Sequence, residues 1–228
     1  MSSSKRAAGV RAAELVEDGM RLGLGTGSTV FYFLEALGQR IREEGLKVTG
    51  VPTSVDTEGK CAEFGIALAS LADVDALDLT IDGADEIDGN FQMIKGGGGA
   101  LLREKVVAHI SRREVIVVGA GKRVERLGTT FDLPLEVVPF SLPVVAREVE
   151  RLGLVPTKRS AKDGGEYRTD NGNAILDLHQ EGGFEDARSL ERELLAIPGV
   201  VEVGLFIDLA DGLIEGADDG SCELLWKE

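Results

Sequence analysis

The first half of the chain alternates short apolar runs with longer segments whose apolar residues recur at helical spacing. The runs at residues 20–24, 48–51, 66–68, 77–82 and 115–118 predict strands, and the segments at 6–18, 30–37, 55–64 and 100–110 predict helices. Strands that alternate with helices form βαβ units and a parallel sheet. We therefore expect an α/β fold with a mainly parallel, Rossmann-like sheet flanked by helices.

The pattern changes near Leu133. Predicted strands at 133–140, 154–159, 174–178 and 200–206 are joined by predicted helices at 142–152 and 184–197. This β-α-β-β-α-β order matches the split βαβ pattern. It predicts a smaller ferredoxin-like α+β domain at residues 133–206. Residues 1–132 and 207–228 would form the α/β catalytic domain, with the apolar tail returning to the first sheet.

The charge balance excludes some classes of partner. The chain has 40 acidic and 25 basic residues and a formal net charge of −15. Most of such a surface repels a polyanion, so we expect no nucleic-acid partner and no binding to an anionic membrane surface. Nine lysines stand against sixteen arginines. An acidic, lysine-poor protein suits a salt-loaded cytoplasm, and this possible halophilic origin predicts a need for high KCl. The alternative is a moderately acidic mesophilic enzyme.

The cysteines and the apolar runs indicate where the protein works. Cys61 and Cys222 are the only cysteines and lie far apart, so we expect no disulfide framework. The first residues lack the apolar stretch of a signal peptide. No run approaches the roughly 18 apolar residues of a membrane span. We expect a cytoplasmic protein.

Three polar loops follow predicted strands of the first sheet. They cover residues 25–29, 82–86 and 119–122. In a parallel sheet the ligand crevice lies beyond the carboxyl ends of the strands. The three loops are therefore expected to share one site.

The first loop belongs to the motif GLGTGST at residues 23–29. Glycines let the chain turn tightly and expose N–H groups, and the following helix adds the positive potential of its N-terminus, so an anion site is expected. A dinucleotide fingerprint would need glycine where Ser28 stands, and no Gly-Lys-Ser/Thr of a P-loop follows. A tight turn with no ligand is the remaining alternative.

The second loop carries the motif DGADE at residues 82–86. Asp82 and Asp85 fall in one loop, and repulsion between two nearby carboxylates helps one of them hold a proton. Such a pair can move protons between sugar hydroxyls. A solvated acidic turn and a magnesium site are the alternatives.

The motif KGGGGALLREK at residues 95–105 follows. Four consecutive glycines form a costly loop unless the backbone must approach something closely. Their N–H groups, beside the Lys95 ammonium, could form an oxyanion hole; a flexible hinge is the alternative. Glu104 falls in the first turns of the next helix. It is either a surface or helix-dipole charge or a general base, and burial near other carboxylates would raise its pKa toward the working pH.

Lysines outside these motifs are weaker candidates. Lys122, in the third loop, could bind a phosphate or simply lie in solvent. Lys5 lies near the N-terminus, where most lysines have no specific role. The two histidines, His109 and His179, fit no triad or metal spacing and are interpreted as structural.

These motifs, in this order and spacing and together with IPGVVEVGLF at 197–206, closely resemble ribose-5-phosphate isomerase of the A type. The resemblance covers nearly the whole chain. It implies an aldose–ketose isomerase that interconverts D-ribose 5-phosphate and D-ribulose 5-phosphate in the non-oxidative pentose phosphate pathway. It implies no cofactor, no metal, a sugar phosphate as the small-molecule partner, and a homodimer or homotetramer.

The resemblance also implies roles for single residues. Glu104 matches the family's proton acceptor, and the other catalytic residues are Asp82, Asp85 and Lys95. The implied substrate-binding residues are Thr26, Gly27, Ser28, Thr29, Asp82, Gly83, Ala84, Asp85, Lys95, Gly96, Gly97, Gly98 and Lys122. Lys5 falls where some members place a phosphate contact. The implied mechanism is a cis-enediolate reaction in which Glu104 moves the proton between C2 and C1.

Two other functions are weighed against this one. A non-catalytic sugar-phosphate sensor would need an output domain, and only 22 residues precede Gly23. A nucleotide-dependent enzyme would need the fingerprint or P-loop that Ser28 and the missing lysine argue against.

Overall fold

The computed structural model describes residues 2–227, and these residues form two compact units. The first unit contains residues 2–84, 103–122 and 209–227, and the second contains Asp85–Leu102 and Arg123–Asp208. The chain therefore passes from one unit to the other four times. The predicted small domain, residues 133–206, lies within the second unit, which also contains residues 85–102 and 123–132. The predicted boundary near Leu133 stays a prediction.

The first unit is built on a seven-stranded sheet with the order β14-β13-β7-β4-β1-β2-β3. Its strands are β1 (Arg21–Leu24), β2 (Thr49–Pro52), β3 (Ala67–Leu68), β4 (Leu79–Asp82), β7 (Glu114–Val118), β13 (Gly212–Gly216) and β14 (Cys222–Trp226). Every neighbouring pair is parallel except β13 with β14. The mainly parallel sheet is thus confirmed, and the apolar tail returns to it through β13 and β14.

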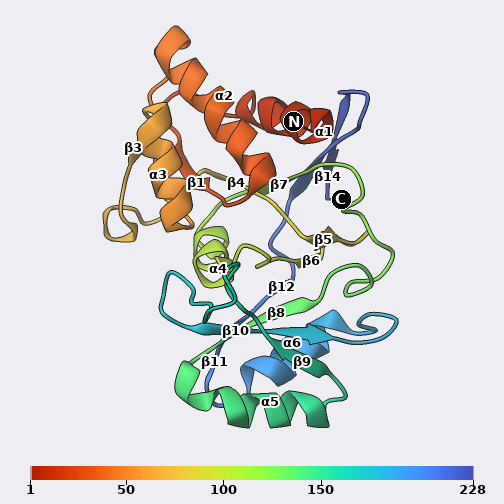
Figure 1. The fold of residues 1–228 in the computed structure, drawn as a ribbon. Coiled ribbons are helices and arrows are strands. Elements are labelled where there is room, and N and C mark those ends of the chain that lie inside the picture. Colours follow the sequence, from red (N-terminus) through yellow and green to blue (C-terminus); the bar gives the residue numbers. More distant parts are fainter. Residues whose placement is uncertain (1, 228) are drawn as a thin grey trace. The chain divides into compact units, whose positions relative to one another are not determined.

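Helices flank this sheet (Figure 1). They are α1 (Ser3–Ala13), α2 (Ser28–Glu44), α3 (Val55–Phe64), α4 (Leu101–His109) and the short 3₁₀ helix η1 (Leu71–Asp73). One apolar core joins α1 and α2 to the sheet through side chains such as Ala12, Phe33, Leu37 and Ile81, all less than 2% exposed. Burial of these side chains is the main stabilising term for the unit.

The first helix differs from its predicted range of 6–18. It begins earlier and ends at Ala13, where the N–H groups of Leu15 and Val16 bond to the carbonyls three residues before them. Such bonds tighten and close a helix end. The chain then turns through Gly19, whose φ of 82° favours glycine, and enters β1.

The second unit contains a four-stranded antiparallel sheet with the order β11-β8-β10-β9. Its strands are β8 (Leu133–Val137), β9 (Val155–Lys158), β10 (Ala174–His179) and β11 (Val200–Val203), and its helices are α5 (Leu142–Arg151) and α6 (Ala187–Leu195). The helices α5 and α6 pack on this sheet around Leu135, Val149, Leu176 and Leu194 (Figure 1). This topology is that of a split βαβ unit and confirms the predicted ferredoxin-like fold.

Two predicted strands of this unit end early. The strand predicted at 133–140 stops at Val137, because Pro139 begins the 3₁₀ helix η2 (Pro139–Ser141). The strand predicted at 200–206 divides at Gly204 into β11 and β12 (Leu205–Phe206), which joins a separate three-stranded sheet. A Cβ on Gly204 would lie 2.4 Å from the Lys95 carbonyl oxygen, so glycine permits this close crossing of two backbones.

The three-stranded sheet has the order β12-β6-β5, with β5 (Glu86–Ile87) and β6 (Met93–Ile94) forming a short hairpin. Glu86 is fully buried and accepts hydrogen bonds from the N–H groups of Gly128 and Thr130, at 2.6 and 2.5 Å. No helix of the described residues is long and apolar enough to cross a membrane.

Candidate active site

The carboxyl ends of β1, β4 and β7 lie side by side in the first unit. The parallel pairing aligns Leu24 with Ile81 and Asp82 with Ile116. The loops at 25–29 and 119–122, and the first-unit part (82–84) of the loop predicted at 82–86, therefore leave the sheet at the same end. This end is where α/β sheets place their ligands.

Asp82 links two of these loops. Its side chain is fully buried, and Oδ1 accepts hydrogen bonds from the N–H groups of Thr26 at 3.0 Å and Gly83 at 2.7 Å. A Cβ on Gly25 would lie 2.2 Å from the same oxygen, so only glycine fits there. These two backbone donors fix the position of the carboxylate.

The loop at 25–29 leads directly into α2. Gly27 is the N-cap residue with a φ of 121°, and Ser28 begins the helix on an exposed surface. The Thr26 hydroxyl lies 2.7 Å from the Thr53 hydroxyl and 2.8 Å from that of Ser54. Free N–H groups of a helix N-terminus and neighbouring hydroxyls are suited to a phosphate.

Lys5 adds positive charge beside this loop. Lys5, on α1, donates a hydrogen bond from Nζ to the Ser28 hydroxyl at 2.8 Å. Its stem packs on Gly119 after β7, where a Cβ would lie 2.9 Å from Lys5 Cγ. Lys122, in the same loop as Gly119, is partly exposed. The weak sequence candidate Lys5 is thus held at the N-terminus of α2.

Glu104 lies in the first turn of α4 and is 6% exposed. Leu101 and Val107 on the same helix are buried, so Glu104 is on the side of the helix that faces the protein. The surface-charge alternative for Glu104 is therefore wrong.

In the second unit, Asp85 directly precedes β5 and Lys95 directly follows β6. The Asp85 N–H donates to the Ile94 carbonyl, and Asp85 Oδ2 accepts from the Gly97 N–H at 2.7 Å. Lys95 is 1% exposed, and its Nζ lies 5.2 Å from the centre of the Phe206 ring. An aromatic face at this distance attracts an ammonium group.

The glycine run after Lys95 needs glycine at three positions. Gly96 and Gly99 have φ values of 105° and 77°. A Cβ on Gly97 would lie 2.7 Å from Asp85 Oδ1 and 2.9 Å from the Phe131 ring. The backbone thus takes conformations and contacts that exclude other residues.

The sequence-predicted residues are divided between the two units. In the first unit these are Thr26, Gly27, Ser28 and Thr29, Asp82, Gly83 and Ala84, Glu104 and Lys122. In the second they are Asp85, Lys95, Gly96, Gly97 and Gly98. Only Gly83 and Ala84 separate Asp82 from Asp85, which limits their Cα separation to about 11 Å.

The histidines and the metal alternative can be judged from the same geometry. His179 lies 2.9 Å from an Asp132 oxygen on the surface, and His109 is exposed in the last turn of α4. Among residues 2–227, no three His, Cys, Asp or Glu side chains are grouped as metal ligands.

Comparison with known proteins identifies the family. The family model described as "Ribose 5-phosphate isomerase A (phosphoriboisomerase A)" matches residues 49–220. The chain belongs to the ribose 5-phosphate isomerase A family. The resemblance drawn from the motifs is confirmed, and with it the expectation of an enzyme of the aldose–ketose isomerase class.

Relatives in this family cover the whole chain. Ribose-5-phosphate isomerase A of Methylorubrum extorquens is 53% identical over 222 residues, which is 95% of this chain and 93% of the relative. The Listeria innocua protein of the same name is 48% identical over 100% of both chains. The solved structure from Plasmodium falciparum has a TM-score of 0.96 at 35% identity and covers 100% of both chains. A D-ribose-5-phosphate isomerase in complex with phospho-erythronic acid has a TM-score of 0.93 at 36% identity, covering 97% of both chains.

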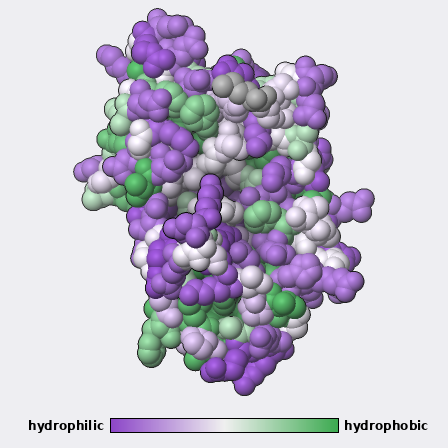
Figure 2. Space-filling model, in the orientation of Figure 1, coloured by the Kyte–Doolittle hydropathy of each residue, from purple (hydrophilic) through white to green (hydrophobic). Residues whose placement is uncertain are grey.

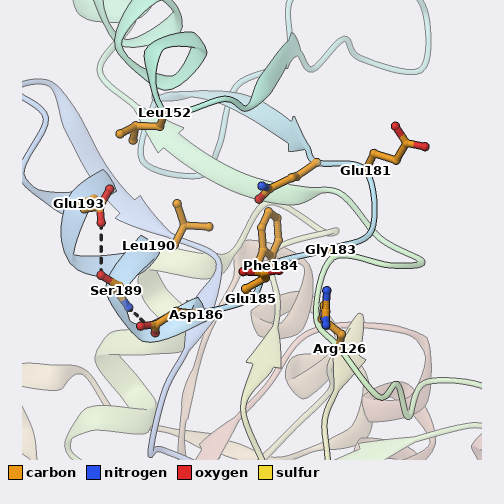
Figure 3. Close-up of a pocket in the computed structure, with 11 residues that line it drawn as sticks. Arg126, Leu152, Glu181, Gly183, Phe184, Glu185, Asp186, Ser189, Leu190 and Glu193 are labelled. Atoms are coloured by element: carbon orange, nitrogen blue, oxygen red, sulfur yellow. Dashed lines mark hydrogen bonds between the residues drawn. The ribbon is translucent and has the colours of Figure 1, made fainter.

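A cavity away from these residues has different chemistry. It has a volume of about 410 Å³ in the second unit, and most of its lining comes from the segment 180–186 after β10 and from α6 (Figure 3). Glu181, Glu185, Asp186 and Glu193 contribute four carboxylates against the single cation Arg126. Such a lining repels a sugar phosphate, so this cavity does not compete with the candidate active site of the isomerase family member.

Several contact residues escaped the sequence analysis. Thr53, Ser54 and Thr57 surround the Thr26 hydroxyl, and Arg159 and Tyr167 bind carbonyls of the glycine run. The PTS segment at 52–54 after a predicted strand was a usable signal for the first group. No local signal marks Arg159 or Tyr167, since both are more than 60 positions from the glycine carbonyls that they bind.

Proposed function

We propose that this protein interconverts D-ribose 5-phosphate and D-ribulose 5-phosphate through a cis-enediolate, as a step of the non-oxidative pentose phosphate pathway. The family match over residues 49–220 and the full-length relatives named ribose-5-phosphate isomerase A support this most strongly. The relative bound to phospho-erythronic acid supports a phosphorylated sugar acid or sugar as ligand.

The phosphate would bind at the amino end of α2. Thr26, Gly27, Ser28 and Thr29 offer hydroxyls and N–H groups there, and Lys5 already donates to Ser28. Lys122 would add a second cation from the loop after β7. Hydrogen bonds from N–H groups and lysines suit a dianion, because charge-assisted bonds are shorter and stronger than neutral ones.

Glu104 is the proposed general base. It would remove the C2 proton of the open-chain aldose and return it to C1, so that the carboxylate ends the cycle unchanged. Its 6% exposure supports the role, because a carboxylate shielded from water is a stronger base than a hydrated one.

Lys95 and the N–H groups of Gly96, Gly97 and Gly98 are proposed to stabilise the charge that develops on oxygen. Asp82 or Asp85 would move the hydroxyl proton between O1 and O2, and one of them would assist ring opening. Fixed donors aimed at a developing oxyanion are worth about 10²–10³ in rate each. No step in this scheme requires a cofactor or a metal.

The test is an isomerisation assay on ribose 5-phosphate with EDTA present. Turnover that survives chelation supports the proposal and removes the magnesium alternative. Binding of the sugar phosphate without turnover would favour the non-catalytic sensor, and turnover that depends on an added nucleotide would favour the nucleotide-dependent enzyme.

Glu104→Gln tests the assigned base, with Glu63→Gln as the matched control on an exposed position of α3. The Glu104 variant is expected to lose kcat by orders of magnitude with little change in KM, because general-base catalysis alone contributes about 10²–10⁴. Near-normal turnover of Glu104→Gln would show that the base lies elsewhere.

A homodimer or homotetramer in the cytoplasm remains part of the proposal. The predicted small domain, residues 133–206, is the proposed contact surface. It exposes apolar side chains, with Phe140 96% exposed and Val155 60% exposed. Light scattering of the native protein and of Phe140→Asp would measure the mass of the assembly and test this surface.

A further inference from the structure

Three consecutive carbonyls of the glycine run are held by side chains that lie far away in the sequence. Arg159 Nη1 donates to the Gly96 oxygen at 2.9 Å and to the Gly97 oxygen at 3.2 Å. The Tyr167 hydroxyl donates to the Gly98 oxygen at 3.2 Å. A glycine segment has little conformational preference of its own, so these bonds choose its conformation.

Both the backbone and the side chain of Arg159 are held by hydrogen bonds. Its backbone N–H donates to the Ile175 carbonyl at 2.9 Å, which extends the β9–β10 pairing by one residue. Its guanidinium forms a two-point ion pair with Asp177 of β10, with Nε 2.9 Å from Oδ2 and Nη2 on Oδ1. The Arg159 and Asp177 side chains are 14% and 20% exposed. A bidentate pair shielded in this way has one geometry, and it leaves Nη1 directed at the glycine carbonyls.

Tyr167 completes this clamp, which we define as Arg159, Asp177 and Tyr167. The Arg159 guanidinium lies 5.6 Å from the centre of the Tyr167 ring. The ring lies against Gly99, where a Cβ would fall 1.8 Å from the hydroxyl oxygen. Burial raises the pKa of Tyr167, so its hydroxyl keeps the proton that it donates.

The N–H groups of the two neighbours of Gly98 both have partners within the protein. The N–H of Gly97 donates to Asp85 Oδ2, and the N–H of Gly99 donates to the Gly96 carbonyl at 2.9 Å. Peptide bonds in the described part of the chain are all trans, so each N–H there points opposite to the carbonyl of the same peptide group. Since the Gly97 carbonyl is bound to Arg159, the Gly98 N–H points away from the clamp. Gly98 is exposed, so this donor is accessible to a ligand.

We propose that Arg159, Asp177 and Tyr167 are positioning residues that present the Gly98 N–H as the oxyanion donor of the isomerisation. This inference rests on the proposed function. The guanidinium also polarises the peptide group between Gly97 and Gly98, because hydrogen bonds in a chain strengthen one another. The donor therefore gains strength as well as direction from a side chain that touches no substrate.

The experiment compares Arg159→Ala, Arg159→Lys and Tyr167→Phe with Arg168→Ala. Arg168 is the control because it lies on the same loop as Tyr167 and pairs with exposed Glu166. Arg159→Ala is expected to lower kcat about 30–100-fold, near the lower end of the loss of one oxyanion donor, with KM changed less than about threefold. Arg159→Lys keeps the charge but not the two-point geometry, so it should restore melting temperature more than kcat. Tyr167→Phe should lower kcat about 3–10-fold, and Arg168→Ala should have the kcat of wild type.

Binding of two anions separates positioning from general damage. Phospho-erythronic acid carries a carboxylate in place of the reacting carbons, whereas inorganic phosphate occupies only the phosphate site. Arg159→Ala and Tyr167→Phe should weaken the binding of phospho-erythronic acid by about the same factor as they lower kcat. They should leave the binding of inorganic phosphate unchanged. Equal weakening of both anions, or normal kcat with a lowered melting temperature, would overturn the inference.

Failure of the two proposals can be told apart. If wild type and Arg168→Ala do not isomerise ribose 5-phosphate, the proposed function is wrong. Suppose instead that wild type and Arg168→Ala both turn over. If Tyr167→Phe, the mildest change, and Arg159→Lys then both keep full kcat, the clamp has no positioning role. An Arg159→Ala protein that does not fold leaves these two variants to decide.

Discussion

Asp85 accepts a hydrogen bond from the backbone N–H of Gly97 at 2.7 Å, across twelve positions of the sequence. The carboxylate can therefore act as an anchor for the glycine run, as a carrier of a substrate proton, or as both. An asparagine at this position keeps an oxygen that can accept the Gly97 bond but cannot carry the proton.

Comparing Asp85→Asn with Asp85→Ala separates these roles. A proton carrier predicts that both variants lose about 10²-fold in kcat, since general acid–base catalysis contributes at least that much. Asp163→Asn is the control, because Asp163 forms a similar bond to the Gly165 N–H in an exposed loop. If Asp85→Asn turns over like wild type while Asp85→Ala does not, Asp85 is an anchor alone.

Gly99→Ala is expected to destabilise the protein more than Gly164→Ala. Both glycines have positive φ values, 77° and 83°, so alanine is strained at either position by about 1–2 kcal/mol. Gly164 has open space around its added Cβ, whereas at Gly99 the Cβ would meet the Tyr167 hydroxyl at 1.8 Å. Displacing that ring should cost a further 1–3 kcal/mol or so.

Urea unfolding at constant temperature measures the difference. Gly99→Ala should also lower kcat, because Tyr167 holds the Gly98 carbonyl, whereas Gly164→Ala should leave kcat unchanged. Equal free energies of unfolding for the two variants would mean that Tyr167 moves aside without cost.

Cys61 should make stability depend on pH in the alkaline range. Its thiol is fully buried in α3, and burial, with a smaller effect of Glu58, raises its pKa from 9.0 to about 11. As pH rises past 9 the thiol of the unfolded chain ionises first, so the folded state loses stability between pH 9 and 11. The loss attributable to this group is about 2–3 kcal/mol.

The free energy of unfolding of wild type minus that of Cys61→Ala isolates this effect from other titrating groups. The difference should be constant below pH 8 or so and fall above it. A thiol reagent gives an independent check at neutral pH. It should modify exposed Cys222 in the native protein and reach Cys61 only on unfolding. Fast reaction of both thiols would contradict the burial of Cys61.

Salt should stabilise the protein if its acidic composition reflects a salt-loaded cytoplasm. Hydrophilic side chains cover most of the face shown in Figure 2, and the net charge is −15. At about 1 M salt the screening length falls to roughly 3 Å, which removes most repulsion between surface carboxylates. The urea midpoint and kcat should both rise with KCl. A midpoint that is already maximal in dilute buffer would favour the mesophilic alternative.

The sequence predicted elements whose apolar residues repeat and missed features that depend on distant contacts. The parallel sheet followed from β-branched runs such as Val115–Val118, and its three loops followed from where each run ended. The division of the strand at Gly204 was not predictable, because in the sequence Gly204 is one position in an apolar run. The need for glycine there comes from the Lys95 carbonyl, which is distant in the sequence. Arg159 was missed for the same reason, since the glycine carbonyls that it binds are more than 60 residues earlier.

The candidate site shows the same limit. Glycines and acids in DGADE and KGGGG pointed to a site because their composition is costly without one. The burial of Glu104 could not be predicted from one acidic position on a helix. Whether its side chain faces the core or the solvent depends on how α4 packs.

The fourfold passage of the chain between its units limits how this enzyme can be re-engineered. Three of the junctions, at 84/85, 102/103 and 122/123, fall within three positions of a proposed catalytic or substrate-binding residue. A chimera that replaces the second unit with that of a relative would therefore need splice points beside Asp82, Glu104 and Lys122. Residues of a relative's second unit would therefore have to be introduced by single substitutions. Truncation from the ends of the chain cannot yield either unit as a continuous polypeptide.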